Sequence, residues 1–324
     1  MRIAVRVGDG IAELSRALET QGHEVVPCVE DAQTAASVTS CDVLVVNGAY
    51  YTKAVAAALC GTGSKIRWVQ FASAGTDPVQ RWGFPDDVLL TNAAAAFAPT
   101  VAEHAFALLL AGYRRIVHMD RVRSTEEWRR DRFVSRLDSV EGTQLAIVGY
   151  GHVGRELAVR AKAFAMRPVV VARRPESARD DGLPAWSLED LAPVLAQADA
   201  VVVCVALAAE TRNLIGAPEL AAMKASAWLV NVARGGVVDE SALLAALRER
   251  RIAGAALDVF AQEPLALDSP LRALDNVLIT PHIAGFGGAA MRARMASMIA
   301  DNVDRFASGL PLRNVVALRG TAHH

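Results

Sequence analysis

The stretch GYGHVG, from Gly149 to Gly154, most constrains how this chain folds. It follows an apolar run at residues 145–148 and opens a helical pattern at residues 155–164, and a second apolar run comes at residues 169–171. A strand, a tight glycine turn, a helix and another strand form a βαβ unit, whose two strands are parallel. The stretch therefore predicts an α/β fold with a parallel sheet.

The three glycines of this turn have separate expected roles in binding a dinucleotide. Gly149 permits the tight turn, Gly151 lets a pyrophosphate approach the backbone, and Gly154 lets the helix pack on the strand. The amides of His152 and Val153 at the helix N-terminus face the anion. A plain turn is the alternative, but the strand before the glycines and the helix after them favour a nucleotide site.

The rest of the chain suggests two α/β domains. Six strand-like runs with helices between them, starting at residue 145, match a complete Rossmann domain. The first ninety residues form a smaller parallel unit, for which a flavodoxin-like fold is expected. Its predicted strands are residues 3–7, 25–29, 42–47 and 68–73, and its predicted helices are Ile11–Thr20 and 52–59.

The final helical segment, Gly288–Ala307, has no further strand to complete, so we expect it to return to the first domain. This predicts a discontinuous substrate domain, residues 1–95 and 286–324, around an inserted cofactor domain, residues 96–285, with a cleft where the chain crosses. A long helical pattern runs from residue 99 to about 130, apolar at first and charged later, and a helix of this kind often leaves its own domain and packs on a partner.

Composition excludes several classes of protein. The chain has 34 basic and 35 acidic side chains in 324 residues, so no overall charge attracts nucleic acid or an anionic membrane. Its four cysteines have no metal-binding spacing, which favours a reduced, cytoplasmic compartment and predicts no metal site. The apolar run at residues 105–111 is expected to be too short to cross a bilayer.

The end of the second cofactor-domain strand indicates which nucleotide binds. An acid usually binds the adenosine ribose hydroxyls there, but this sequence has Ala172, followed by Arg173 and Arg174. Two guanidiniums would pair with a 2′-phosphate, which an acid would repel. The sequence therefore favours NADP(H), with NAD(H) as an alternative. The two arginines could instead be simply solvated, but that would not explain why the acid is missing.

Three later stretches, NVARGG, LDVFAQEP and TPHIAG, contain Arg234, Glu263 and His282. Together they resemble the active site of the D-2-hydroxyacid dehydrogenases. An imidazole, whose ordinary pKa is near 6.5, both donates and accepts protons near neutrality, and a neighbouring carboxylate stabilises its protonated form. A guanidinium binds a carboxylate and polarises a carbonyl. The resemblance thus implies that His282 is the general acid and base, Glu263 its partner, and Arg234 the substrate-binding cation.

The resemblance extends to other positions. FASAGTD implies that the amides of Ala74 and Gly75 hold the substrate carboxylate. Asp258 resembles the acid near the nicotinamide carboxamide, although an aspartate that caps a turn is the alternative. Val205 opens VALAAET, the expected adenine rim, where alanines stand at positions at which relatives have prolines and a threonine. Trp128 resembles part of the arm through which these enzymes dimerise, so we expect a homodimer; a tryptophan buried in its own domain is the alternative.

The resemblance implies an NAD(P)-dependent reductase of small 2-oxoacids such as glyoxylate or hydroxypyruvate. Two other hypotheses remain open. A cofactor-sensing protein related to the corepressors would bind nucleotide without turnover. A phosphite or other oxidoreductase on the same scaffold would need further cations, for which Arg81 and Arg136 are candidates.

Overall fold

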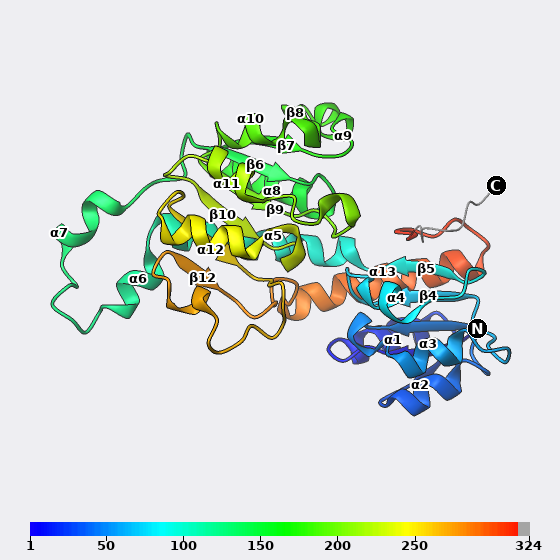
Figure 1. Cartoon of the computed structure of the whole chain (residues 1–324). Helices are drawn as coiled ribbons and strands as arrows, with labels where there is room; N and C mark the ends of the chain where they lie inside the picture. The colour runs from blue at the N-terminus through cyan, green and yellow to red at the C-terminus, as the bar shows by residue number, and fades with distance from the viewer. Residues whose placement is uncertain (317–324) are drawn as a thin grey trace. The chain divides into compact units, whose positions relative to one another are not determined.

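The computed structural model describes residues 1–316 and divides into two compact units (Figure 1). The first comprises Met1–Phe97 and the segment that begins at Phe286, and the second comprises Ala98–Gly285. Both are parallel α/β units, which confirms the expected fold class. The chain passes from the first unit to the second between Phe97 and Ala98, inside a helix and two residues after the position expected from the sequence.

The first unit has a five-stranded parallel sheet in the order β2-β1-β3-β4-β5, which is the flavodoxin-like order. The inner strands β3 and β4 are buried along their whole length, because helices cover both faces of a parallel sheet. The fifth strand was not predicted, since LLTN is short and half polar. The strands are β1 (Arg2–Arg6), β2 (Glu24–Pro27), β3 (Val43–Val46), β4 (Trp68–Phe71) and β5 (Leu89–Asn92).

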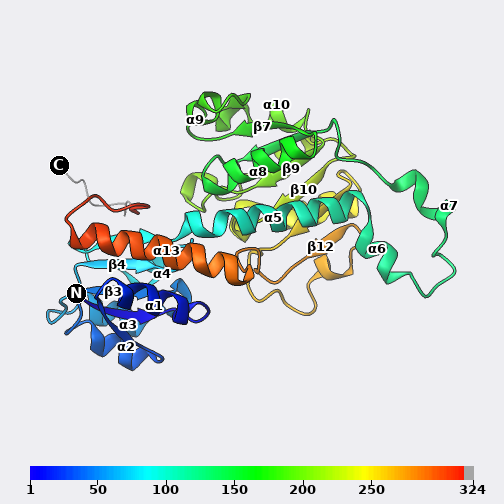
Figure 2. The ribbon, with the colours of Figure 1, turned by 180° about the vertical axis from the view of Figure 1, so that it is seen from behind.

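Two helix layers enclose this sheet. The helices α1 (Ile11–Thr20) and α13 (Gly288–Ala307) share one hydrophobic cluster and lie side by side in Figure 2. The return of the last helix to the first unit is therefore confirmed. The other face is covered by α2 (Asp31–Ser37), α3 (Lys53–Leu59) and α4 (Asp77–Trp82).

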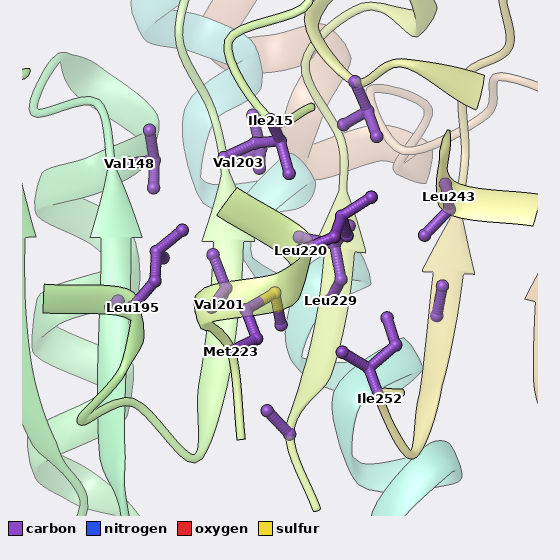
Figure 3. Packing of buried hydrophobic residues seen from close by; sticks show 14 of the residues in the cluster. Val148, Leu195, Val201, Val203, Ile215, Leu220, Met223, Leu229, Leu243 and Ile252 are labelled. Atoms are coloured by element: carbon purple, nitrogen blue, oxygen red, sulfur yellow. The ribbon is translucent and has the colours of Figure 1, made fainter. Parts of the chain in front are cut away.

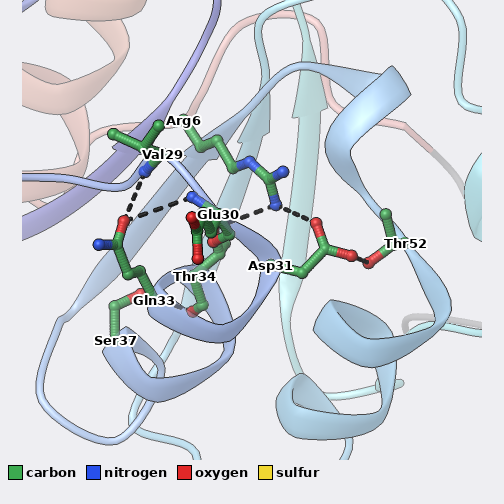
Figure 4. A network of polar contacts seen from close by, with 8 residues as sticks. All are labelled: Arg6, Val29, Glu30, Asp31, Gln33, Thr34, Ser37 and Thr52. Carbon is green, nitrogen blue, oxygen red and sulfur yellow. Dashed lines mark hydrogen bonds and ion pairs between the residues drawn. The ribbon is translucent and has the colours of Figure 1, made fainter.

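A polar network joins the end of β1 to the start of α2 (Figure 4). The guanidinium of Arg6 binds the carboxylate of Asp31, and the hydroxyl of Thr52 donates to the same carboxylate at 2.7 Å. The Thr52 hydroxyl and then the Arg6 guanidinium lower the pKa of Asp31. Arg6 also stacks on the ring of Tyr50 at 4.8 Å, so this network ties strand, helix and loop together.

The second unit has seven parallel strands in the order β12-β11-β10-β9-β6-β7-β8. Six were predicted; the seventh, β8, has only two residues. The order reverses between β9 and β6, and ligands of such folds bind at the carboxyl ends of the strands at this position. The strands are β6 (Gln144–Val148), β7 (Arg167–Val171), β8 (Ala185–Trp186), β9 (Ala200–Val203), β10 (Trp228–Asn231), β11 (Gly254–Leu257) and β12 (Val277–Ile279).

Helices cover both faces of this sheet as well. Figure 3 shows the cluster formed with α10 (Leu191–Leu195), α11 (Ala217–Ala222) and α12 (Glu240–Arg248). The opposite cluster includes α5 (Ala94–Tyr113), α8 (His152–Ala163) and α9 (Glu176–Asp180). In it the ring of Trp228 fills the space left by two glycines, because a Cβ atom on Gly112 or Gly254 would lie 2.7 or 2.6 Å from the indole.

The prediction of one long helix from residue 99 to about 130 is wrong. The helix α5 begins five residues earlier, in the alanine-rich segment that favours helix, and ends at Tyr113. Arg115 then takes a left-handed conformation with φ of 49°. Two short helices follow, α6 (Ile116–Arg121) and α7 (Arg130–Phe133).

The apolar stretch of α5 is also longer than the sequence suggested. By length and composition α5 alone, within residues 1–316, is long and apolar enough to cross a membrane. This is weak evidence, since core helices meet the same criteria. Several of its side chains lie in the core of the second unit: Ala102, Ala105, Phe106, Leu108 and Leu109.

Candidate active site and nucleotide site

The glycine turn between β6 and α8 has the geometry expected of a nucleotide site. Gly149 has a φ of 110°, which favours glycine, and a Cβ on Gly154 would lie 2.2 Å from the carbonyl oxygen of Gly149. A Cβ on Gly151 would meet no atom within 4 Å. The fold of the protein therefore requires glycine at the first and third positions. The second glycine is exposed and leaves open space where a pyrophosphate would approach.

The helix α8 begins at His152, so the amides of His152 and Val153 lie in its first turn, as the sequence predicts. Sequence reasoning did not identify Cys204, which follows β9. Its Sγ donates to the carbonyl oxygen of Gly149 at 3.2 Å, and burial raises the pKa of the thiol to about 12. This thiol thus helps to hold the glycine turn and stays protonated.

His282 and Glu263 come together although 19 positions separate them in the sequence. Nδ1 of His282 lies 2.6 Å from Oε2 of Glu263, and Oε1 of Glu263 accepts from the amide of Phe260 at 3.0 Å. The histidine is 45% exposed and the glutamate 35%, so both remain accessible to a small molecule. With Nδ1 engaged by the carboxylate, Nε2 is the ring atom left for proton transfer.

Arg234 lies in the turn after β10, and Nη1 donates to the carbonyl oxygen of Ala233 at 2.8 Å. The side chain of Asn231 shapes this turn by accepting from the amide of Ala233 and donating to the carbonyl oxygen of Arg234. A Cβ on Gly235 would lie 1.9 Å from the backbone of Phe260. This close approach brings the arginine turn against the segment that leads to Glu263.

Asp258 has a role within the fold that the sequence offered only as an alternative. It is 1% exposed, and its carboxylate accepts from the Thr280 hydroxyl at 2.6 Å and from the amides of Ile283 and Ala284 at 2.9 Å. Its carbonyl oxygen accepts from the amide of His282 at 2.8 Å. Asp258 therefore fixes the loop that carries His282, which has a left-handed φ of 54°.

His104 on α5 supports the same loop, and sequence reasoning also missed it. Its Nε2 lies 3.0 Å from the Thr280 hydroxyl and 3.5 Å from the Asp258 carboxylate. No local pattern reveals this contact, since the histidine is 176 positions from the threonine.

The expected adenosine side of the site contains an ion pair that the sequence did not indicate. Nη1 of Arg173 lies 3.2 Å from Oε1 of Glu210, in the 3-10 turn η4 (Ala209–Thr211) after β9. Arg174 is exposed beside it. The Val205 side chain lies against the glycine turn, since a Cβ on Gly149 would be 2.9 Å from it.

The alanine-rich segment after Val205 is held by one hydroxyl. The side chain of Thr211 donates to the carbonyl oxygen of Ala206 at 2.7 Å and accepts from the amide of Ala208 at 2.8 Å. The rim therefore has a defined conformation without the prolines that the resemblance led us to expect.

A cavity of about 310 Å³ adjoins the histidine and glutamate in the second unit. Apolar side chains form most of its wall, with Arg272 as a cation that donates to the carbonyl oxygens of Leu265 and Ala266. The lining residues are Phe260, Glu263, Pro264, Leu265, Arg272, Ile279, Thr280, Pro281 and His282.

In the first unit, the loop after β4 carries Ala74 and Gly75. The Ser73 hydroxyl accepts from the amide of Gly48 at 3.2 Å, and the Asn92 side chain donates to the carbonyl oxygen of Ala74 at 3.1 Å. Among residues 1–316, the amides of Ala74 and Gly75 make no hydrogen bond. A loop held from both sides with two available amides has the donors that a carboxylate needs.

The other candidate residues are Trp128, Arg81 and Arg136. Trp128 is 61% exposed, so the alternative of a tryptophan buried in its own unit is wrong. Arg81 stacks on Trp82 at 4.7 Å in the first unit, and the carbonyl oxygen of Arg136 accepts from the side chain of Arg115 in the second.

Comparisons with known proteins agree with this architecture. Residues 106–284 match the family model described as "D-isomer specific 2-hydroxyacid dehydrogenase, NAD binding domain". A glyoxylate reductase of Korarchaeum cryptofilum is 38% identical over 84% of this chain and 81% of that protein. A glycerate dehydrogenase of Methylorubrum extorquens is 35% identical over 78% of this chain and 79% of that protein.

A solved structure of similar fold is a D-isomer specific 2-hydroxyacid dehydrogenase from Xanthobacter autotrophicus Py2 in complex with NADPH and MES. It is 27% identical, covers 98% of this chain and 99% of its own, and has a TM-score of 0.79. Fold and matches together define an oxidoreductase that uses a nicotinamide dinucleotide. The chain belongs to the D-isomer specific 2-hydroxyacid dehydrogenase family.

Proposed function

We propose that this protein reduces small 2-oxoacids, such as glyoxylate or hydroxypyruvate, to D-2-hydroxyacids. The observation that carries the proposal is the 2.6 Å contact between Nδ1 of His282 and Oε2 of Glu263, beside the turn of Arg234. The glyoxylate reductase and glycerate dehydrogenase relatives support this substrate class.

The residues have complementary roles in this reaction. The nicotinamide supplies the hydride when bound. Nε2 of His282 donates the proton to the carbonyl oxygen, and the Glu263 carboxylate stabilises the protonated imidazole and orients the ring. The guanidinium of Arg234 binds the substrate carboxylate and polarises the carbonyl. In the reverse direction neutral His282 accepts the hydroxyl proton.

The glycine turn, the amides of His152 and Val153, and Val205 form the proposed nucleotide site. Arg173 and Arg174 supply positive charge for a 2′-phosphate, so NADPH is the preferred cofactor in this proposal and NADH the alternative. The relative solved with NADPH is consistent with that preference. The carboxylate of Asp258 holds the loop of His282. We propose that its Oδ2 atom, which accepts one hydrogen bond from the amide of Ala284, also contacts the carboxamide.

The first unit, for which we expected residues 1–95 and 286–324, is the proposed substrate domain, and residues 96–285 are the proposed cofactor domain. The amides of Ala74 and Gly75 are the proposed carboxylate donors of the first unit. We also propose a cytoplasmic homodimer, in which the exposed Trp128 belongs to the dimer contact.

The test is to add glyoxylate, hydroxypyruvate and larger 2-oxoacids to the protein with NADPH and, in parallel, with NADH. Oxidation of the nucleotide is measured as a loss of absorbance. Turnover with the small acids is the expected result. Tight nucleotide binding without turnover across the whole panel would instead favour a cofactor-sensing protein.

A further inference from the structure

The ion pair between Arg173 and Glu210 crosses the carboxyl end of β6. Arg173 follows β7 and Glu210 follows β9, and these two strands are the neighbours of β6 in the sheet. Neighbouring strands lie about 4.8 Å apart, so the pair joins loops that begin roughly 10 Å from each other. Between those loops is the turn that starts at Gly149.

In folds of this kind the adenosine half of a dinucleotide lies over that turn, with the ribose beside the end of the second strand. Arg173 is therefore next to the position of a 2′-phosphate. Glu210 contributes a negative charge to the same guanidinium at 3.2 Å. A phosphorylated and an unphosphorylated ribose would meet this pair differently, because only the phosphate competes for Arg173.

We propose that Glu210 is a specificity-determining residue, which competes with the 2′-phosphate for Arg173 and so limits the preference for NADPH over NADH. This inference rests on the proposed function. In it the arginine pair favours NADPH, whereas Glu210 reduces that preference. NADH leaves the Arg173–Glu210 pair intact. NADPH must draw the guanidinium of Arg173 away from the Glu210 carboxylate before the 2′-phosphate can bind it.

The exposure of the two side chains sets the expected size of the effect. Arg173 is 69% exposed and Glu210 36%, so the pair is partly solvated and exchanges partners easily. We expect a change of about three- to tenfold in affinity, since solvent weakens the interaction between partly exposed charges at a protein surface.

The experiment is calorimetric titration of the full chain with adenosine 2′,5′-bisphosphate and adenosine 5′-monophosphate, which differ only in the 2′-phosphate. NADPH and NADH are titrated in parallel. The variant Glu210→Gln keeps the shape of the side chain and removes its charge. The matched control is Glu249→Gln, which removes a carboxylate that also pairs with an arginine, Arg251, elsewhere in the second unit.

Glu210→Gln should tighten the bisphosphate and NADPH about three- to tenfold and leave the monophosphate and NADH within about twofold. Glu249→Gln should change none of the four. In an Arg173→Gln background the gain from Glu210→Gln should shrink, since residues that share a partner are not additive.

Three results would overturn the inference: an equal change for both nucleotide pairs, no change in any, or a full gain that persists without Arg173. The first two would leave the proposed function standing, because nucleotides still bind. Failure of every nucleotide to bind the unmodified protein would overturn both the inference and the proposed function. Melting curves of each variant establish that it is folded.

Discussion

Nδ1 of His282 lies 2.6 Å from Oε2 of Glu263, while the second oxygen of Glu263 accepts from the amide of Phe260. The carboxylate is therefore anchored to the backbone on one side and orients the imidazole on the other. Asp258 adds a second constraint by accepting from the amides that follow His282. The histidine is thus held at both ring and backbone, as the proposed proton transfer requires.

His282→Ala should abolish turnover and leave nucleotide affinity within about twofold. Loss of a general acid lowers the rate by roughly 10²- to 10⁴-fold. Within residues 1–316, the histidine makes no hydrogen bond with the glycine turn. Steady-state rates and nucleotide titration check this, and an equal loss of affinity would mean that the residue maintains the fold.

Gly151→Ala and Gly154→Ala form a matched pair of variants. A Cβ at residue 151 meets nothing in the protein, so we expect normal thermal stability but nucleotide binding weakened by at least tenfold. A Cβ at residue 154 would lie 2.2 Å from the carbonyl oxygen of Gly149, so stability itself should fall by about 1–3 kcal/mol or more. Melting curves with and without nucleotide separate the two effects; equal stability of both variants would contradict the assignment.

Gly235→Ala should be among the most damaging single-methyl changes. Its Cβ would lie 1.9 Å from the Phe260 backbone, which cannot move without disturbing the amide that binds Glu263. We expect a loss of about 3 kcal/mol or insoluble protein. Gly182→Ala is a useful comparison, since a Cβ there has open space, although its φ of 72° brings some backbone strain. Unfolding in urea measures both, and similar losses would argue against the close approach.

Replacing Arg173 and Arg174 together with alanine should weaken NADPH by tenfold or more and change NADH by about twofold at most, because each guanidinium–phosphate contact is a charge-assisted hydrogen bond. Titration with both nucleotides tests this. An unchanged ratio of the two affinities would refute the role of the arginine pair.

Lys224→Gln should reduce thermal stability in a pH-dependent way. Burial raises the pKa of Asp199, but the Gln144 amide at 2.8 Å and the Lys224 ammonium at 2.7 Å together lower it below its ordinary value of 3.8. A carboxyl group whose pKa is lower in the folded state contributes stability above its unfolded pKa, and the contribution disappears as the pH falls through the folded pKa.

The difference in melting temperature between the original protein and Lys224→Gln should therefore be a few degrees near neutrality, for a loss of about 1 kcal/mol. It should shrink as the pH falls below about 4. Melting curves from pH 7 to pH 3 measure it, and a difference that stays constant with pH would contradict this account.

Much of the fold was predictable because its signals are local. The helices Ile11–Thr20 and Gly288–Ala307 have the predicted bounds, since apolar periodicity marks their buried faces. The strand β8 escaped notice because two residues carry no pattern. The left-handed Arg115, which ends the expected long helix, also has no local signal, because arginine gives no preference for that conformation.

The sequence indicated the residues of the candidate site but not the residues that hold them in place. His282 and Glu263 stand in short recognisable stretches, and the structure brings them into contact. The partners of Asp258 lie 22 to 26 positions away, and the partner of Arg173 lies 37 positions away. Such pairs depend on the order of strands in the sheet, which a linear pattern does not specify.

Trp228 illustrates how far this dependence reaches. Its ring occupies volume that Gly112 on α5 and Gly254 on β11 leave open. The three positions therefore form one steric unit, in which a larger residue at either glycine is acceptable only with a smaller one at position 228. In related sequences these positions should vary together or remain as they are, so the size of one side chain restricts the evolutionary freedom of two distant segments.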